Sequence, residues 1–143
     1  MMRMELDGCD IMPINKVNYT DVWGVYESNR EYLQSWELGK VVEVDDILET
    51  FTRLPDGYDA SKQVFVGIWR NGEPVAICDL LPQLDGDDNL WLSEIIVHQD
   101  EKGKGFGKSI VQAIVAAAQQ ADFARITLGC SKSKALFLAK NGL

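Results

Sequence analysis

The sequence predicts an α/β domain in which a mixed, twisted β-sheet carries helices on both faces. Two β-rich segments flank Asn71-Gly72, a dipeptide that strongly favours a two-residue hairpin turn, so part of the sheet is antiparallel. Farther along, a strand, a glycine-rich loop, a helix and another strand follow in order, which is typical of a parallel crossover. The chain has 143 residues, no internal repeat and no linker-like stretch. We therefore expect residues 1–143 to form a single domain around one core.

Each element has its own local signal, because strands show β-branched or alternating segments and helices show apolar residues at three- and four-residue spacing. The expected strands are residues 10–14, 64–69, 74–81, 90–97 and 124–130. The expected helices are residues 20–39 with a polar break at 28–30, residues 44–54, residues 105–120 and residues 135–140. Pro13 indicates that the first strand lies at an edge, because proline donates no hydrogen bond to a sheet.

Composition and charge restrict the partners. The chain carries 14 basic and 22 acidic residues, and its net charge of −8 opposes binding to a nucleic-acid backbone. The longest apolar run is too short to cross a bilayer, and the N-terminus lacks the apolar core of a signal peptide. The three cysteines, Cys9, Cys78 and Cys130, follow no disulfide or metal spacing, and His98 is the only histidine. We expect a cytoplasmic protein with no metal and no nucleic-acid or membrane partner.

The segment from residue 97 to residue 109 is the one that indicates chemistry. It contains glycines at alternate positions together with lysines, and these are Gly103, Gly105 and Gly107, and Lys102, Lys104 and Lys108. Glycine lets backbone N–H groups approach a bulky anion closely. The helix that follows adds free N–H groups and the positive end of its dipole. The sequence therefore predicts a phosphate or pyrophosphate ligand.

Two known phosphate-binding motifs fail at single positions. The dinucleotide fingerprint G-x-G-x-x-G needs its third glycine one residue after Gly107. The P-loop G-x-x-x-x-G-K-S/T matches Gly107-Lys108-Ser109, but its first glycine would stand at position 102, which is Lys102. No later strand ends in an aspartate that could bind magnesium for such a loop.

Residues 102–107 resemble a third motif, the pyrophosphate loop Q/R-x-x-G-x-G/A of the GNAT (Gcn5-related N-acetyltransferase) superfamily. Gly105 and Gly107 match its two glycines, and Lys102 stands in place of Gln or Arg. The flanking segments resemble the family's fourth strand, fifth strand and closing helix, and these are residues 94–98, 124–128 and 135–143. The resemblance covers the chain from Ile11 onward.

The resemblance implies transfer of the acetyl group of acetyl-CoA to a primary amine of a small molecule or peptide, by direct attack in a ternary complex. Backbone amides of the fourth strand would position the pantetheine. The acetyl-CoA contacts that it implies lie at the end of this strand, in the loop and in the first helical turn, and they are Ile96, Val97, Lys102, Gly103, Lys104, Gly105, Phe106, Gly107, Lys108 and Ser109. A catalytically silent acyl-CoA-binding or regulatory module is the alternative function.

Glu94 is the expected general base, because a carboxylate on the fourth strand is placed to take the proton of an ammonium substrate. A solvated carboxylate on an alternating strand is the alternative interpretation. Asp79, near the end of the preceding strand, is the second choice of base. Beside the loop, His98 is expected at the surface, and Cys130 is expected as a buried apolar residue.

Two other groups of residues have structural interpretations with a functional alternative. The aromatic residues at helical spacing favour a core or cleft wall over an alkyl-amine cage, and they are Trp23, Tyr26, Tyr32 and Trp36. The acidic segment 85–88 favours a solvated turn over a calcium site.

The sequence departs from the family in two places. Leu138 stands where many members have a tyrosine that protonates the departing CoA thiolate. The family usually continues with a β-hairpin beyond the point at which this sequence ends, at Leu143, so that hairpin is not expected here. The strand at residues 124–130 would then be an open edge, which favours a symmetric homodimer.

Overall fold

A computed structural model describes residues 2–30 and 43–128 of the chain. Within these ranges the strands are β1 (Asp10–Pro13), β2 (Val64–Arg70), β3 (Glu73–Pro82), β4 (Asn89–Val97) and β5 (Arg125–Leu128). The α-helices are α1 (Trp23–Glu27), α3 (Glu49–Thr52) and α4 (Phe106–Gln120). Short 3-10 helices are η1 (Tyr19–Val22), η2 (Val44–Leu48), η3 (Ala60–Lys62) and η4 (Gln99–Glu101).

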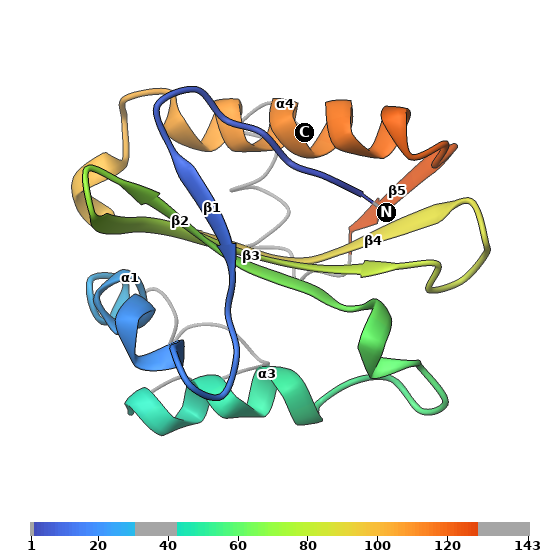
Figure 1. Ribbon diagram of the computed structural model, residues 1–143, viewed down its shortest axis with the longest axis horizontal. Helices are drawn as coiled ribbons and strands as arrows, with labels where there is room; N and C mark the ends of the chain where they lie inside the picture. Colours follow the sequence, from blue (N-terminus) through green and yellow to red (C-terminus); the bar gives the residue numbers. More distant parts are fainter. Residues whose placement is uncertain (1, 31–42, 129–143) are drawn as a thin grey trace.

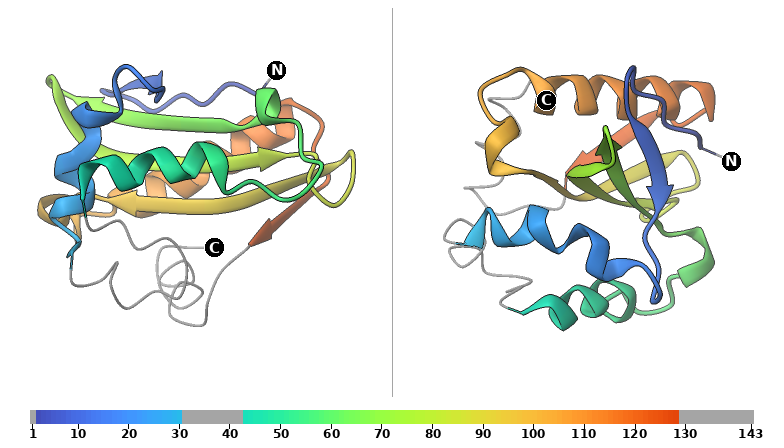
Figure 2. Two further views of the ribbon diagram at one scale, coloured as in Figure 1. Left: turned by 90° about the horizontal axis from the view of Figure 1, so that it is seen from below. Right: turned by 60° about the vertical axis from the view of Figure 1, so that its left-hand side comes forward.

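The strands form one sheet in the order β1–β2–β3–β4–β5. Helix α4 covers one face of this sheet, and α1 and α3 cover the other (Figure 1). Two further views show the same three layers from below and from the side (Figure 2). The predicted fold class, an α/β domain with helices on both faces of a mixed sheet, is confirmed.

The predicted hairpin lies between β2 and β3, which pair antiparallel from Val64 opposite Leu80 to Arg70 opposite Glu73. Asn71 has a φ of 54° and Gly72 a φ of 78°. Positive φ at both central residues is what a type I′ turn requires, and this turn matches the twist of the flanking strands.

Strand β1 lies at one edge of the described sheet, as Pro13 predicted, and pairs antiparallel with β2 alone. The strand ends at Pro13, one residue earlier than expected. The Ile14 N–H nevertheless donates to the Phe65 carbonyl at 2.8 Å.

The crossover from β4 through α4 to β5 makes the second part of the sheet parallel, as predicted. Asn89 lies opposite Arg125 and Leu92 opposite Leu128. The described part of β5 starts one residue later than expected and runs to Leu128. The expected remainder of that strand and the closing helix at residues 135–140 lie outside the described residues.

The segment expected as one helix at residues 44–54 is instead the 3-10 helix η2 followed by a single turn, α3. Its start contains Val44, Asp45 and Asp46, residue types with low helix propensity. Glu43 and Asp46 form a reciprocal capping box there. The earlier helical segment begins with η1 and continues as α1, which ends at the predicted polar break, and residues 31–42 lie outside the described residues.

Both faces of the sheet are buried, which explains why the central strands are apolar along most of their length. The core on the α4 side includes Cys78, Leu80, Leu92, Ile110 and Ile114. The core on the α1 and α3 side includes Val25, Tyr26, Ile47, Phe65 and Ile96. Residues that alternate along β3 and β4 therefore belong to different layers, and this alternation decides which side chains reach the site.

Candidate functional site

The glycine-rich loop leaves its backbone open in front of α4. Gly103 has a φ of +81° and Gly105 a φ of +76°, values that residues with a side chain rarely adopt. A Cβ on either glycine would meet no heavy atom within 4 Å. Gly105 is the N-cap of α4, and the N–H groups of the first helical turn have no acceptor inside the helix. This geometry leaves N–H donors at a helix N-terminus open to an anion.

The predicted loop residues come together at this helix start. Phe106 and Gly107 begin α4, and Gly107 is buried. The Ser109 N–H and hydroxyl both donate to the Gly105 carbonyl, at 3.1 and 3.2 Å. Lys104 and Lys108 are exposed beside the open backbone. The loop therefore presents two exposed cations next to the N–H donors of the helix start.

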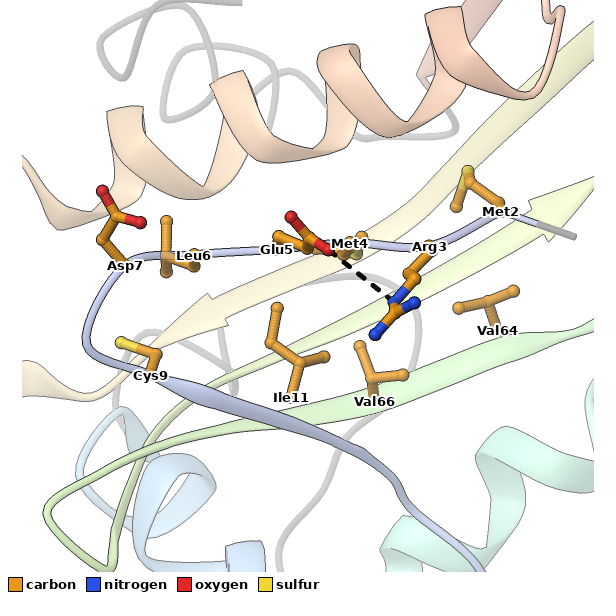
Figure 3. A pocket seen from close by; sticks show the side chains of 10 residues that line it. All are labelled: Met2, Arg3, Met4, Glu5, Leu6, Asp7, Cys9, Ile11, Val64 and Val66. Atoms are coloured by element: carbon orange, nitrogen blue, oxygen red, sulfur yellow. Dashed lines mark ion pairs between the residues drawn. The ribbon is translucent and has the colours of Figure 1, made fainter.

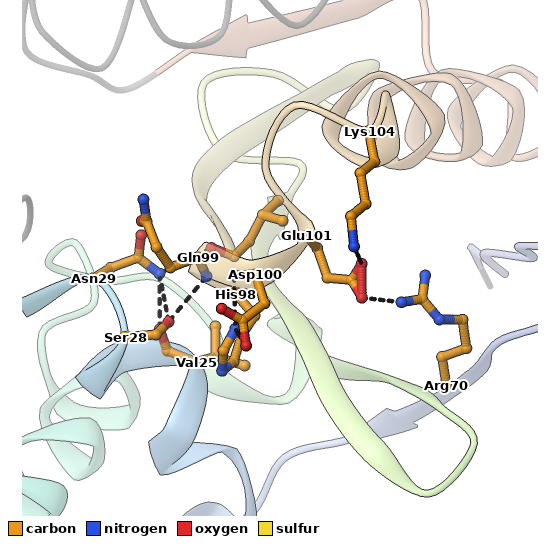
Figure 4. Close-up of polar contacts among 10 residues, drawn as sticks. Val25, Ser28, Asn29, Arg70, His98, Gln99, Asp100, Glu101 and Lys104 are labelled. Atoms are coloured by element: carbon orange, nitrogen blue, oxygen red, sulfur yellow. Dashed lines mark hydrogen bonds and ion pairs between the residues drawn. The ribbon is translucent and has the colours of Figure 1, made fainter.

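A buried carboxylate anchors the loop to the β2–β3 hairpin. Glu101 forms an ion pair with Arg70, the last residue of β2, and lies 3.9 Å from the Lys104 ammonium. In Figure 4, Arg70 and Lys104 reach Glu101 from two directions. The Arg70 guanidinium also lies 5.5 Å from the centre of the Phe106 ring, a cation–π distance. These contacts hold both ends of the glycine segment in place.

Strand β4 contains a β-bulge directly before Glu94. Leu92 lies opposite Leu80 and Glu94 lies opposite Asp79, so Ser93 is an extra residue on β4. The bulge changes which side chains face each layer. Without it, Glu94 would continue the series of Leu92 and point into the α4 core.

After the bulge, Ile95 belongs to the core on the α4 side and Ile96 to the core on the α1 side. Alternation therefore places the half-buried Glu94 on the α1 and α3 face. Together with burial, the negative charge of the Glu94 carboxylate raises the pKa of Tyr26 of α1, which agrees with this placement.

Asp79 lies directly across from Glu94 on the same face and is 6% exposed. The Gln63 side-chain N–H donates to Asp79 Oδ1 at 2.9 Å. Burial, followed by the charge of Asp79, raises the pKa of Tyr58 to about 12. Since cross-strand neighbours have Cβ atoms about 4.5–5.5 Å apart, the two carboxylates form one negative site.

Tyr26 of α1 lies on the same face of the sheet as these two carboxylates. Its side chain is 1% exposed, and its hydroxyl has no hydrogen-bond partner among the described residues. Burial, followed by the charges of Glu94 and Asp79, raises the pKa of Tyr26 well above its ordinary value. The nearby Thr50 side chain lowers the pKa of Tyr26, but the two hydroxyl groups do not have the geometry of a hydrogen bond. The phenol therefore stays protonated next to two carboxylates.

Over the described residues, β5 pairs only with the first four residues of β4, from Asn89 to Leu92. The rest of β4, from Ser93 to Val97, extends past the described end of β5. This part of the strand lies between the bulge and the glycine loop.

One hydrogen bond shows to which side the backbone N–H and C=O groups of this part of β4 point. The His98 N–H donates to the Val75 carbonyl on β3 at 2.8 Å. Because backbone groups of successive residues point to opposite sides of a strand, those of Val97 and Ile95 point away from β3. Those of Ile96 point toward β3. Ile96 was expected to contact the ligand through its backbone, but its backbone groups point toward β3 and its buried side chain packs on the α1 face. Ile95 was not among the expected contacts, and its backbone groups point away from β3.

A protein-family model described as the GNAT family of acetyltransferases matches residues 22–142. This match spans most of the chain. The chain belongs to the GNAT family. The resemblance inferred from the loop is confirmed, and acyl transfer is the general reaction of this acetyltransferase family.

Solved structures of acetyltransferases share the fold. An acetyltransferase from Thermus thermophilus has a TM-score of 0.71 at 18% identity, over 96% of this chain and 88% of that chain. A ribosomal-protein-alanine N-acetyltransferase from Brucella melitensis biovar Abortus 2308 has a TM-score of 0.59 at 16% identity, over 87% and 81%. An aminoglycoside acetyltransferase from an uncultured soil metagenomic sample has a TM-score of 0.61 at 9% identity, over 96% and 89%. At these identities the similarity shows the fold alone. No curated protein matched the chain.

The remaining residues considered for this GNAT protein have structural roles where the structure describes them. His98 Nδ1 accepts the Asp100 N–H at 3.1 Å and caps η4, so its ring is oriented by the backbone beside the loop. The acidic segment 85–88 is an exposed turn, as expected, and Arg125 pairs with Asp88 across it at 3.2 Å. Tyr32, Trp36, Cys130 and Leu138 lie outside the described residues.

Two kinds of feature are absent from residues 2–30 and 43–128. No three His, Cys, Asp or Glu side chains in these ranges gather as a metal-binding group. No helix in the same part of the chain has the length and apolar character to cross a membrane.

A cavity of about 390 Å³ lies elsewhere, between the N-terminal arm and the strands β1 and β2. Figure 3 shows Met4 and Leu6 of the arm above Ile11 and Val66, with Arg3 and Glu5 forming an ion pair at 3.7 Å. The cavity is at the opposite edge of the sheet from β4 and β5, and none of the predicted site residues lines it. It is therefore separate from the candidate site.

The sequence did not single out three residues that organise the site. Ile95 could have been identified from strand alternation relative to Val97. Arg70 follows the apolar run of β2 as its only charge, which is a weak signal. Asn29 stands in the polar break after α1, and nothing local indicates its contact with residues about 70 positions away.

Proposed function

We propose that the protein transfers the acetyl group of acetyl-CoA to a primary amine of a small molecule or peptide, by direct attack in a ternary complex. The observation that carries the proposal is the placement of β4. The half of β4 from Ser93 to Val97 leads from the open glycine loop to the bulge, and the bulge directs Glu94 to the α1 and α3 face. A ligand with its pyrophosphate at the loop would therefore extend along the strand toward a carboxylate.

The loop would hold the pyrophosphate with the backbone N–H groups of residues 103–108, supported by the ammonium groups of Lys104 and Lys108 and the hydroxyl end of Ser109. The Val97 N–H and the backbone groups of Ile95 would pair with the amide groups of the pantetheine along β4, since the Val97 carbonyl already accepts a hydrogen bond from Asn29. Ile96 and Phe106 would contribute apolar surface beside it. Lys102 belongs to the same site through the hydrogen bond that its ammonium donates to Asn29 Oδ1 at 2.6 Å.

Acetyl-CoA supplies the acyl group as a thioester. Glu94 would accept a proton from the acceptor ammonium, directly or through water, so that the neutral nitrogen attacks the carbonyl carbon. The N–C bond forms, the nitrogen releases its second proton to water, the C–S bond breaks, and CoA leaves as a thiolate. A thiol of this kind has a pKa of about 8.5, so departure without a dedicated acid is feasible near neutral pH. The main contribution of the protein would be orientation.

Two further properties belong to the proposal. Cys9 and Cys78 are free thiols, which supports a reducing, cytoplasmic compartment. Strand β5 is the outer strand of the described sheet, which supports pairing with the same strand of a second copy in a symmetric homodimer. Size-exclusion chromatography with light scattering measures this state directly.

The function is tested by following CoA release from acetyl-CoA with a panel of amines that includes polyamines, aminoglycosides, amino acids and peptide N-termini. We expect amine-dependent release, and we expect Glu94→Gln to lower kcat/KM about ten- to a thousand-fold. Glu73→Gln removes an exposed carboxylate at the hairpin and serves as the matched control. Tight CoA binding without release for any amine would instead favour the silent binding module.

A further inference from the structure

Asn29 is a buried amide at the end of α1 that contacts two distant segments. It is 2% exposed. Its Nδ2 donates to the carbonyls of Val25 and Val97, both at 2.8 Å. Its Oδ1 accepts a hydrogen bond from the Lys102 ammonium at 2.6 Å. One side chain therefore joins α1, the end of β4 and the start of the glycine loop.

A neighbouring contact joins the same segments. The Ser28 hydroxyl donates to the Val25 carbonyl at 2.9 Å and accepts the Gln99 N–H at 3.1 Å. Figure 4 shows Ser28 and Asn29 at the end of α1, directed toward the segment that follows β4. Helix α1 belongs to the face that carries Glu94, and the loop belongs to the proposed CoA site. The contacts thus connect the two halves of the proposed reaction centre.

Lys102 differs from the other lysines of the loop. Lys104 and Lys108 are exposed, whereas Lys102 is half-buried, and burial lowers its pKa. If its ammonium moved to a phosphate, the Asn29 Oδ1 would lose a charged donor at a position that water hardly reaches. Lys104 and Lys108 can approach a phosphate without that loss.

We propose that Asn29 and Lys102 are a positioning pair, and that Lys102 promotes CoA binding by holding the loop against α1 rather than by contacting the pyrophosphate. This inference rests on the proposed function, because it concerns the same loop and the same ligand. The pair would also fix the position of the Val97 carbonyl on β4, because this carbonyl accepts a hydrogen bond from Asn29 Nδ2. Substitution of either residue would therefore disturb the acceptor side as well as the CoA side.

Calorimetric titration of CoA at low and high salt separates the two roles of lysine. A cation that contacts phosphate contributes to the salt dependence of the dissociation constant, because its attraction is screened by ions. We expect Lys104→Met and Lys108→Met to reduce this dependence. We expect Lys102→Met to weaken binding about three- to tenfold, the effect of one hydrogen bond, with the salt dependence closest to wild type. Lys16→Met removes an exposed charge far from the loop and is the control.

A double-mutant cycle then tests the pair itself. In an Asn29→Ala background, Lys102→Met should have no further effect on the CoA dissociation constant or on the acceptor KM. Ser28→Ala, which removes the neighbouring contact, should leave the effect of Lys102→Met intact. If Asn29→Ala does not fold, the salt series decides alone.

The outcomes are distinguishable. An equal effect of Lys102→Met in both backgrounds, or a loss of salt dependence as large as that of Lys104→Met, would show direct phosphate contact and overturn this inference alone. Wild-type protein that binds no CoA would overturn the proposed function and the role of the pair together.

Discussion

Asp79 on β3 and Glu94 on β4 lie directly opposite one another, on the face of the sheet that α1 and α3 cover. The bulge at Ser93 creates this pairing, because it shifts the register of β4 by one residue. Two like charges at this separation oppose each other's ionisation. The less exposed partner, Asp79, is held by Gln63, which leaves Glu94 as the carboxylate better placed to exchange a proton with a substrate.

Asp79→Asn should therefore move the acid limb of the kcat/KM profile to lower pH, because Glu94 would ionise without a neighbouring negative charge. The measurement is kcat/KM against pH with one amine acceptor for wild type and variant. Asp59→Asn removes an exposed carboxylate whose partner is Ser61, and it should leave the profile unchanged. An acid limb that stays in place in Asp79→Asn would remove the coupling from the mechanism.

The parts of the fold that follow from local patterns were predictable. The turn at Asn71-Gly72, the order of strands and the start of α4 at Gly105 all depend on residues close in sequence. The face that Glu94 occupies was left open in the sequence, because the bulge depends on pairing between strands rather than on a motif.

The same limit applies to Asn29, whose partner Val97 is 68 residues away. The helix expected at residues 44–54 is shorter and begins as a 3-10 segment, because Val44, Asp45 and Asp46 have low helix propensity. The contact of Asn29 and the face of Glu94 depend on long-range pairing, whereas the shorter helix follows from local propensity.

Gly105→Val should abolish most CoA binding while the fold persists. Gly105 has a φ of +76°, so any side chain there strains the backbone, and a valine would also occupy the open space beside the loop. Gly57 has a φ of +80° with equally open surroundings and lies in a distant turn. Gly57→Val should therefore carry a similar cost in stability, about 1–3 kcal/mol, and leave CoA affinity unchanged.

Calorimetry with CoA and urea unfolding measure the two effects of this pair of variants separately. Equal CoA affinity in wild type and Gly105→Val would refute the assignment of the loop. Loss of affinity in both variants would point to a general effect of backbone strain.

Tyr26→Phe should stabilise the protein by about 1 kcal/mol, because it removes a buried hydroxyl without a partner among the described residues. Tyr58→Phe is the matched control. Its hydroxyl donates to the Pro82 carbonyl at 2.7 Å, so its removal should lower the free energy of unfolding by about 1 kcal/mol. Urea unfolding at neutral pH compares them. Destabilisation of the same size in both variants would mean that the Tyr26 hydroxyl is hydrogen-bonded in solution.

Cys78 should make the protein lose stability in alkali. Its side chain is 0% exposed, and burial, followed by the charge of Asp79, raises its pKa from 9.0 to about 12. In the unfolded chain the thiol ionises near 9, so its contribution is fully present below that pH. The contribution is lost as pH rises from 9 toward 12, because only the unfolded state then releases the proton.

The slope expected from this one thiol is about 1.4 kcal/mol per pH unit within that window. Tyr26 and Tyr58 have raised pKa values too, and they add to the loss above pH 10. Urea unfolding under reducing conditions, on both sides of pH 9, should show a flatter decline in Cys78→Ala than in wild type, although its stability at neutral pH is lower because of the cavity. Cys9→Ala, which removes a less buried thiol, should keep most of the wild-type slope. Parallel declines in wild type and Cys78→Ala would mean that this thiol ionises as readily in the folded core as in the unfolded chain.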